Sequence, residues 1–85
     1  MKLKLLYFAR LREAFGCAEE EVIVPAGIGD VAALLEWLRA RGGNFAVELA
    51  PGRAFRVAVD QQMAGPQTRL HGDAEVAVFP PVTGG

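Results

Sequence analysis

A chain of 85 residues forms one small domain, because it has no room for a second hydrophobic core. Apolar residues make up 52% of the sequence and charged residues 22%, a balance that favours a folded domain over an intrinsically disordered chain. The formal net charge of -1 argues against a nucleic-acid binder, and the single cysteine and single histidine exclude an internal disulfide and a zinc site built from several such residues.

The N-terminus carries no recognisable targeting segment. The apolar stretch Met1–Phe8 is too short for the apolar part of a signal peptide with its cleavage site, and no run of residues approaches the length of a membrane-spanning helix. We therefore expect a soluble, cytoplasmic protein that binds neither nucleic acid nor membrane.

The N-terminal part of the chain predicts two strands. Residues 2–8 start with a strict alternation of polar and apolar side chains, which is the period of a half-buried strand. Residues 10–15 suit a short helical turn that Gly16 ends, and residues 21–24 form a second apolar run that stops at Pro25. The first two strands are expected to form a hairpin.

The clearest helix begins after Asp30. A carboxylate at this position can accept hydrogen bonds from the free N–H groups of a first helical turn. Apolar residues then recur at the spacing of one helical face, and Gly42-Gly43 supplies a left-handed stop. The residues of that face are Val31, Leu34, Leu35 and Leu38.

The C-terminal half reads as a loop followed by three strands. Residues 44–53 show little periodicity and are predicted as a loop with at most one helical turn. Residues 55–59 alternate in the manner of a strand, and a tight turn at Asp60-Gln61 leads into a short strand at 62–64. The last strand covers 74–79.

This order of elements predicts an α+β fold. One main helix packed on one face of a five-stranded mixed sheet is the ubiquitin-like, β-grasp arrangement, and it leaves the other sheet face open to solvent. We expect a β-grasp domain over residues 1–79 and a flexible Gly-Gly tail over residues 80–85.

The side chains of the domain do not form a convincing catalytic site. A nucleophile pair would require Cys17 to lie near His71, and no third group is evident to orient the imidazole. We interpret the cysteine as a small apolar filler and the histidine as a surface residue. The acidic run Glu19-Glu20-Glu21 resembles a carboxylate pair but suits the solvated start of a strand better.

The C-terminal tail is a stronger candidate for function. Pro80-Pro81 ends the last strand and holds the chain extended. The four residues that follow span roughly 13 Å at about 3.3 Å per residue. Because glycine lacks a Cβ atom, Gly84-Gly85 can thread a narrow channel and bring the terminal carboxylate to a partner. Val82 and Thr83 complete the tether.

Three stretches of the sequence are recognisable together. They are Leu6-Tyr7-Phe8-Ala9 with Leu11-Arg12-Glu13, then Val57-Ala58-Val59-Asp60-Gln61, and, most specifically, Glu75-Val76-Ala77-Val78-Phe79-Pro80-Pro81-Val82-Thr83-Gly84-Gly85. On these stretches the sequence resembles the small, sulfur-carrying subunits of molybdopterin synthases over its whole length. The turn residue Asp60 stands where that family more often has asparagine, and Leu70-His71-Gly72-Asp73-Ala74 departs from the usual turn before the last strand.

The resemblance implies a carrier cycle for the molybdenum cofactor. A ubiquitin-activating-like adenylyltransferase would use ATP to adenylate Gly85, and a sulfur donor enzyme would convert the acyl-adenylate to a thiocarboxylate. The tail would then enter the large catalytic subunit of a heterotetramer with two copies of each subunit and deliver sulfur to the dithiolene carbons of the precursor. On this view the chain is not an enzyme on its own and binds no metal or permanent cofactor.

Strand alternation also predicts a docking patch. Phe8 falls in phase with the lysines of the first strand, away from the core, and Phe79 falls on the same open face of the last strand. The β-grasp fold places these strands side by side, and we expect Met63 beside the two aromatic rings. Exposed aromatic patches of this kind commonly mark partner sites.

Three alternatives remain open at this stage. The chain could be a thiamine-pathway sulfur carrier, although those chains are usually shorter and lack the Phe-Pro-Pro ending. It could be a protein modifier that is conjugated to lysine through the same terminal glycine. It could also be an interaction domain with an inert tail.

Overall fold

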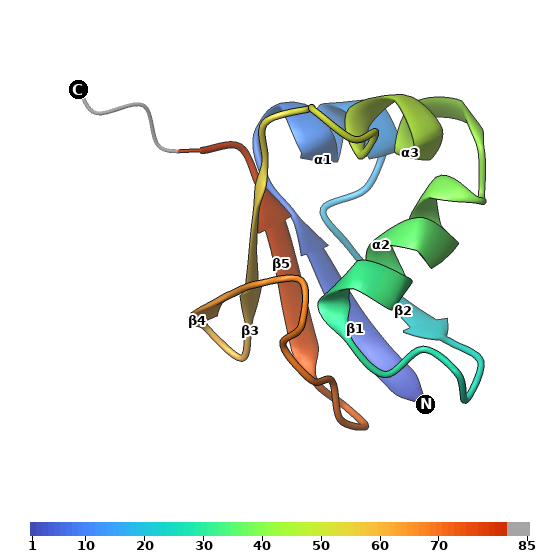
Figure 1. The fold of residues 1–85 in the computed structure, drawn as a ribbon. Coiled ribbons are helices and arrows are strands. Elements are labelled where there is room, and N and C mark those ends of the chain that lie inside the picture. The colour runs from blue at the N-terminus through green and yellow to red at the C-terminus, as the bar shows by residue number, and fades with distance from the viewer. Residues whose placement is uncertain (82–85) are drawn as a thin grey trace.

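The computed structural model describes residues 1–81, and its five strands form one mixed sheet with the helices gathered on one face (Figure 1). None of the helices in this part of the chain is long and apolar enough to cross a membrane. In chain order the elements are β1 (Lys2–Tyr7), α1 (Arg10–Phe15), β2 (Glu19–Ile23), α2 (Val31–Arg39), α3 (Gly43–Glu48), β3 (Arg56–Val59), β4 (Gln62–Ala64) and β5 (Glu75–Phe79).

The strand order β2-β1-β5-β3-β4 places the first and the last strand side by side in the interior of the sheet. β1 pairs with β2 in antiparallel fashion and with β5 in parallel fashion, while β3 lies antiparallel to both β5 and β4. The parallel central pair flanked by antiparallel strands confirms the predicted β-grasp class.

The core lies between the sheet and the helices. Every second residue of the central strands points into it, and α2 contributes the apolar face that its spacing predicts. Leu34 and Leu38 are fully buried, whereas Leu35 is only partly buried at the edge of the face. The strand residues of the core are Leu3, Leu5, Tyr7, Val22, Val57, Val59, Val76 and Val78.

The structure confirms two local predictions, the N-cap of α2 and the tight turn between β3 and β4. The Asp30 side chain accepts a hydrogen bond from the Ala33 N–H at 2.8 Å and so caps α2. Between β3 and β4, Asp60 and Gln61 have φ values of 50° and 69°, which are the positive angles that a two-residue type I′ hairpin turn requires. The asparagine-to-aspartate difference at this turn therefore leaves its backbone geometry intact.

The predicted loop over residues 44–53 was wrong in its first half, where α3 forms. Gly43, expected to end the preceding helix, is the first residue of this one. Six residues are too few to show a helical period. The helix is held by tertiary contacts instead: the Phe45 ring stacks on Phe15 with 4.1 Å between centroids, and the Asn44 side chain donates to the Ala14 carbonyl at 2.7 Å.

The second strand also begins earlier than predicted, at Glu19 in place of Glu21, and it ends at Ile23 in place of Val24. The acidic start is drawn into the sheet because Glu19 lies opposite Leu6 and its carboxylate pairs with Lys4 at 3.3 Å. Three other strands differ by one residue at one end: β1 stops before Phe8, β3 starts after Phe55, and β5 starts after Ala74.

Candidate functional site

The parallel pairing of β1 and β5 builds the site at one edge of the sheet. Parallel strands end at the same edge, so the residues that follow β1 and β5 emerge together. The last pair in register is Tyr7 with Val78, and the Phe8 N–H donates to the Val78 carbonyl at 3.2 Å. Pro80 and Pro81 continue from β5 at this edge, the end of the sheet at which α1 lies (Figure 1).

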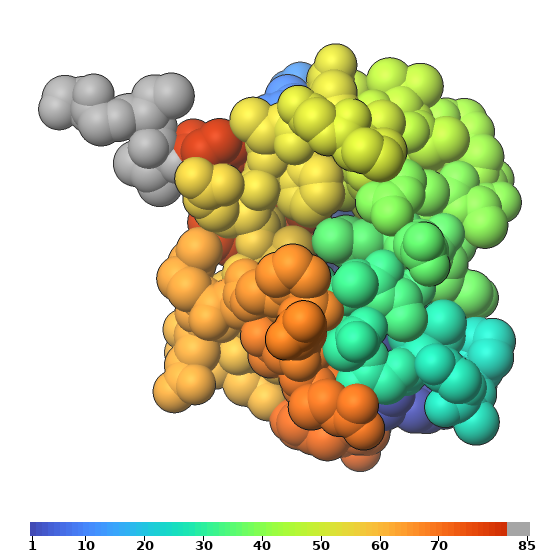
Figure 2. Space-filling model, viewed as in Figure 1, coloured from blue at the N-terminus to red at the C-terminus, as the bar shows by residue number. Residues whose placement is uncertain are grey.

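A shallow apolar hollow of about 490 Å³ opens at the root of the tail. Its lining holds two aromatic rings and two prolines but no charged side chain, so it suits apolar partner groups. In Figure 2 the last described residues, in red, emerge beside the yellow segment that leads into β3. The lining residues are Phe8, Ala9, Ala77, Phe79, Pro80 and Pro81.

The hollow continues into an apolar strip across the open face of the sheet. The register places Leu6 beside Ala77, Ala77 beside Ala58, and Ala58 beside Met63, so one row crosses four strands. These side chains are absent from the cluster that packs against the helices, and strand alternation places them on the opposite face, where Ala58 is nevertheless only 9% exposed. We call Leu6, Phe8, Ala58, Met63, Ala77 and Phe79 together the open-face patch.

The predicted docking residues are not equally exposed. Phe8 is 47% exposed and Met63 65%, whereas Phe79, which we expected to be exposed, is half-buried. The difference follows from position in the sheet: Phe79 lies on the central strand β5, flanked by β1 and by Arg56 of β3, while Met63 lies on the edge strand β4. Met63 is also separated from β5 by β3, so it lies on the same face without adjoining Phe79.

A strained turn directs Phe8 toward this face. Ala9 has φ 53° and ψ -129°, a conformation that glycine favours and that belongs to the second residue of a type II′ turn. The Leu11 N–H closes the turn by donating to the Phe8 carbonyl at 3.1 Å. The chain therefore leaves Phe8 exposed and buries Leu11 fully within three residues. Sequence reasoning missed Ala9, since nothing in an alanine signals a positive φ.

The opposite end of the open face is charged. Lys2 pairs with Glu21 at 2.9 Å and Lys4 with Glu19 at 3.3 Å. The hydrogen bond from Lys2 lowers the pKa of Glu21, and the same bond raises the pKa of the lysine. The face is thus divided into an ion-paired half and an apolar half that adjoins the tail.

Cys17 and His71 have different partners in the structure and do not form a nucleophile pair. Cys17 packs partly buried against the core, and burial raises the pKa of its thiol, which disfavours the reactive thiolate. His71 is exposed, and its Nε2 lies 2.6 Å from Asp60 Oδ2. Among residues 1–81 no three His, Cys, Asp or Glu side chains are arranged to hold a metal ion.

A partly buried polar network, which sequence reasoning also missed, ties the segment after α2 to the sheet. The Tyr7 hydroxyl donates to Glu20 at 2.7 Å, and Arg41 donates to both oxygens of the same carboxylate at 2.9 and 3.1 Å. Burial alone would raise the pKa of Glu20, but the hydrogen bonds from Arg41 and Tyr7 outweigh it and lower the pKa. The network orders the fold and lies on the core side, away from the open-face patch.

The structure brings together Phe8, Phe79, Pro80 and Pro81 from the predicted site, and it leaves Met63 further along the same face. The other predicted site residues lie outside the described part of the chain. These are Val82, Thr83, Gly84 and Gly85.

Two known proteins are similar to this chain in sequence over almost its whole length. The molybdopterin synthase sulfur carrier subunit of Escherichia coli (strain K12) is 37% identical over 83 residues, which cover 98% of this chain and 99% of that protein. The protein of the same name from Haemophilus influenzae (strain ATCC 51907 / DSM 11121 / KW20 / Rd) is 31% identical with the same coverage.

Solved structures of other proteins have a similar fold. A Pyrococcus furiosus protein provisionally assigned as molybdopterin converting factor, subunit 1, has a TM-score of 0.80 and 29% identity, covering 96% of this chain and 99% of that one. Small archaeal modifier protein 1 from H. volcanii has a TM-score of 0.68 and 25% identity, covering 95% and 98%. The model of the ThiS family matches residues 5–85, nearly the whole sequence, and the chain therefore belongs to the ThiS family.

Proposed function

We propose that this chain is the sulfur carrier of molybdopterin synthesis, with Gly85 as the group that carries the sulfur. The observation that carries the proposal is the full-length similarity to two molybdopterin synthase sulfur carrier subunits. The site supports it, because the described chain leaves the sheet beside an apolar hollow and not within a pocket of catalytic side chains. The catalytic groups then belong to partner proteins.

The proposed cycle begins with activation of the terminal carboxylate. The Gly85 carboxylate attacks the α-phosphate of ATP on an adenylyltransferase, and pyrophosphate leaves. A sulfur donor enzyme then supplies sulfur at the oxidation level of sulfide, this sulfur attacks the acyl carbon, AMP leaves, and the product is a thiocarboxylate. Activation is needed because a carboxylate is a poor acceptor for a nucleophile, whereas AMP is a good leaving group.

The second half of the cycle takes place in the large catalytic subunit. The tail delivers the thiocarboxylate to that subunit, where its sulfur bonds to a carbon of the precursor and displaces an oxygen substituent there. Water then hydrolyses the bond between the sulfur and the acyl carbon, which returns Gly85 as a carboxylate, and a second loaded carrier supplies the sulfur of the other dithiolene carbon. Four residues beyond Pro81 reach roughly 13 Å at about 3.3 Å per residue, so the open-face patch can dock while the terminus enters a separate active site. Two copies of each subunit, and a cytoplasmic location, complete the proposal.

Intact-mass measurement tests the proposal directly. The chain is incubated with the adenylyltransferase, ATP and the sulfur donor of the same genome, and its mass is recorded before and after. We expect the mass to rise by the difference between one sulfur and one oxygen atom, and the rise to disappear after incubation with the large subunit and precursor. A mass that stays unchanged, with the starting mass confirming a free Gly85 carboxylate, would exclude the carrier function.

A second candidate function is protein modification through the same glycine. The similarity to small archaeal modifier protein 1 of H. volcanii favours it at the level of fold and modest identity. Conjugation would join the activated Gly85 to a lysine amine and release AMP, leaving a branched peptide that proteomic digestion detects. In a deletion strain supplied with a tagged wild-type chain, lysine conjugates that carry the Gly85 branch would support modification, and their absence while molybdopterin is made would exclude it. A thiamine-pathway role predicts instead that thiamine, and not molybdopterin, is lost.

A further inference from the structure

Arg56 is a cation of the open sheet face that no carboxylate of residues 1–81 neutralises. The other two cations of this face, Lys2 and Lys4, each pair with a glutamate of β2. Arg56 is exposed, and among the described residues its guanidinium has one long hydrogen bond, 3.5 Å from Nη1 to the neighbouring Phe55 carbonyl. Sequence alternation already places it on this face, but its lack of a partner is visible only in the structure.

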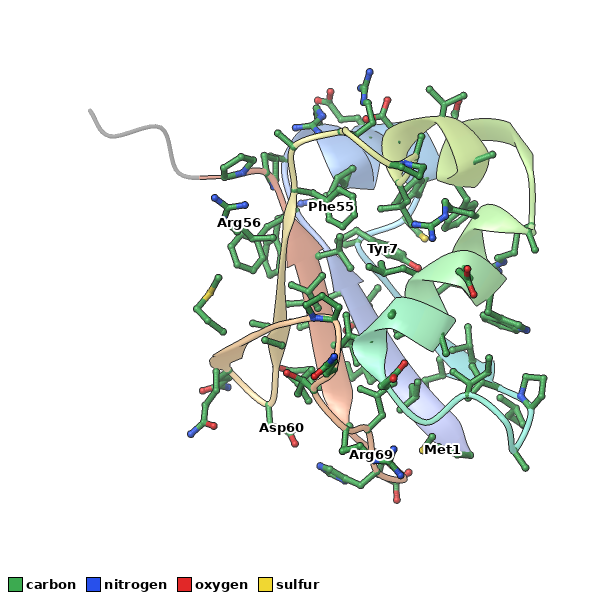
Figure 3. All side chains as sticks on the ribbon, viewed as in Figure 1. Met1, Tyr7, Phe55, Arg56, Asp60 and Arg69 are labelled. Carbon is green, nitrogen blue, oxygen red and sulfur yellow. The ribbon has the colours of Figure 1, made fainter. Side chains whose placement is uncertain are left out.

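The position of Arg56 connects it to the tail. In the register of β3 and β5 it lies opposite Phe79, the residue before Pro80-Pro81. Figure 3 shows its side chain at the edge of the sheet where β5 gives way to the tail, at the opposite end of the molecule from Arg69. The open-face patch borders it along β5 and β3, so a partner that covers the patch also covers the guanidinium.

An arginine in this setting requires a specific kind of partner. Covering a guanidinium with an apolar surface alone would remove its hydration without replacing the hydrogen bonds. A carboxylate replaces them in bidentate geometry, and the surrounding apolar groups strengthen the pair by excluding water. Arginine is accordingly among the residues enriched at the energetic centres of protein interfaces.

We propose that Arg56 is a specificity-determining docking residue that binds an aspartate or glutamate of the large catalytic subunit beside the entrance to its active site. This proposal rests on the function proposed above. The residue would select and orient the partner and take no part in the chemistry, because the tail places Gly85 up to roughly 13 Å from Pro81.

Binding measurements on charge variants test the proposal. We would measure the Kd for the large subunit of the same genome with wild type, Arg56→Glu, Arg56→Gln and Arg56→Lys. We expect Arg56→Glu to weaken binding by at least about tenfold and Arg56→Gln to weaken it by less. The Kd of Arg56→Lys should lie between those of the wild type and Arg56→Gln, because lysine keeps the charge but cannot form the bidentate pair. Raising the salt concentration should weaken the wild type more than Arg56→Gln.

Arg69→Glu is the matched control. It makes the same change in net charge at an exposed arginine far from the tail, so it should leave the Kd within about twofold of the wild type, as expected for a charge outside the contact area. Sulfur transfer in a single turnover at saturating carrier should keep its wild-type rate in Arg56→Gln. A second measurement scans the partner: reversing the charge of one acidic residue of the large subunit should restore binding to Arg56→Glu.

The outcomes separate the two proposals. Wild-type chain that binds no large subunit would contradict the carrier function itself. Wild-type binding with an unchanged Kd for Arg56→Glu, or an equal loss for Arg69→Glu, would overturn the role of Arg56. A loss in the single-turnover rate at saturation with an unchanged Kd would also overturn it, because the residue would then act in the chemistry and not in docking.

Discussion

At the scale of single residues, Ala9 combines an exposed side chain with a backbone that alanine disfavours. We expect Ala9→Val to lower the free energy of unfolding by about 1–3 kcal/mol, because a β-branched residue fits this φ poorly. Ala9→Gly should change it by less than about 1 kcal/mol, since relief of strain offsets the greater freedom of the unfolded chain. Chemical denaturation measures both; a valine variant as stable as the wild type would contradict the turn geometry.

The pair of Asp60 and His71 gives a prediction for pH. The hydrogen bond to Asp60 raises the pKa of His71 above 6.5, and the hydrogen bond from the Glu75 N–H, followed by that from His71, lowers the pKa of Asp60 below 3.8. The histidine's contribution to stability is full below pH 6.5 and is lost as the pH rises through its raised pKa. The aspartate's contribution is present above pH 3.8 and is lost as the pH falls through its lowered pKa.

The test is an NMR titration of His71 in the wild type and in Asp60→Asn. Asparagine can still accept the Glu75 N–H and suits the turn, so the fold is kept while the charge is removed. We expect the pKa of His71 to fall toward 6.5 in the variant. Equal values in the two proteins would show that the carboxylate does not hold the imidazole in solution.

At the scale of the elements, α2 is held to the sheet by its apolar face. Leu34 has no exposed surface, so Leu34→Ala should lower the free energy of unfolding by about 2–4 kcal/mol through the cavity it leaves. Val57→Ala should act in the same direction on the strand side of the core, where Val57 is 6% exposed. Val47→Ala, at a position that is 54% exposed on α3, is the control and should stay within about 0.5 kcal/mol.

The strand phases of β1 and β5 give a second prediction at this scale. Phe8→Asp should leave the free energy of unfolding within about 1 kcal/mol and weaken binding to the large subunit by more than about 2 kcal/mol, because the ring is exposed alone and covered by a partner. Phe79→Asp should weaken binding similarly at a larger cost in stability, since that ring is half-buried. Both variants should also bind the adenylyltransferase less well.

Ile23→Asp serves as the control for these variants. Ile23 is 80% exposed and lies opposite Lys2 on the edge strand, at the end of the sheet away from the tail. It should leave both stability and binding near wild type. Calorimetric titration and thermal melts decide the matter: if Phe8→Asp folds and binds normally, the open-face patch is not a docking surface and the tail alone is recognised.

At the scale of the whole molecule, the domain positions the tail and the partners perform the chemistry. Deleting Gly85, or adding one residue after it, should abolish sulfur transfer and leave the melting temperature unchanged, because the reactive carboxylate must lie at a fixed reach from the docked domain. Synthase assays with mass confirmation of each terminus measure the effect. Normal activity of an extended, untrimmed chain would show that reach is not the constraint.

The sequence by itself determined the order of the strands along the chain, the position of the main helix, and which faces of the strands and the helix point into the core. Its alternating strands and the spaced leucines of α2 are local patterns with a fixed period, and the turn at Asp60-Gln61 depends on neighbouring residues alone. The same alternation placed Phe8 on the open face, although it did not reveal that Phe79 is half-buried by the strands on either side.

Only the tertiary structure decided the features that join distant segments. α3 exists because Phe45 stacks on Phe15, and the network of Tyr7, Glu20 and Arg41 joins three elements that no local pattern connects. The apolar hollow arises because β1 and β5 run parallel and end at one edge. Among residues 1–81, Arg56 has no carboxylate partner because Glu19 and Glu21 of this face lie on β2, three strands away in the sheet, and Glu75 lies at the other end of β5 from Phe79, the residue opposite Arg56. Burial and pairing depend on what the fold places beside a residue, which a one-dimensional period cannot specify.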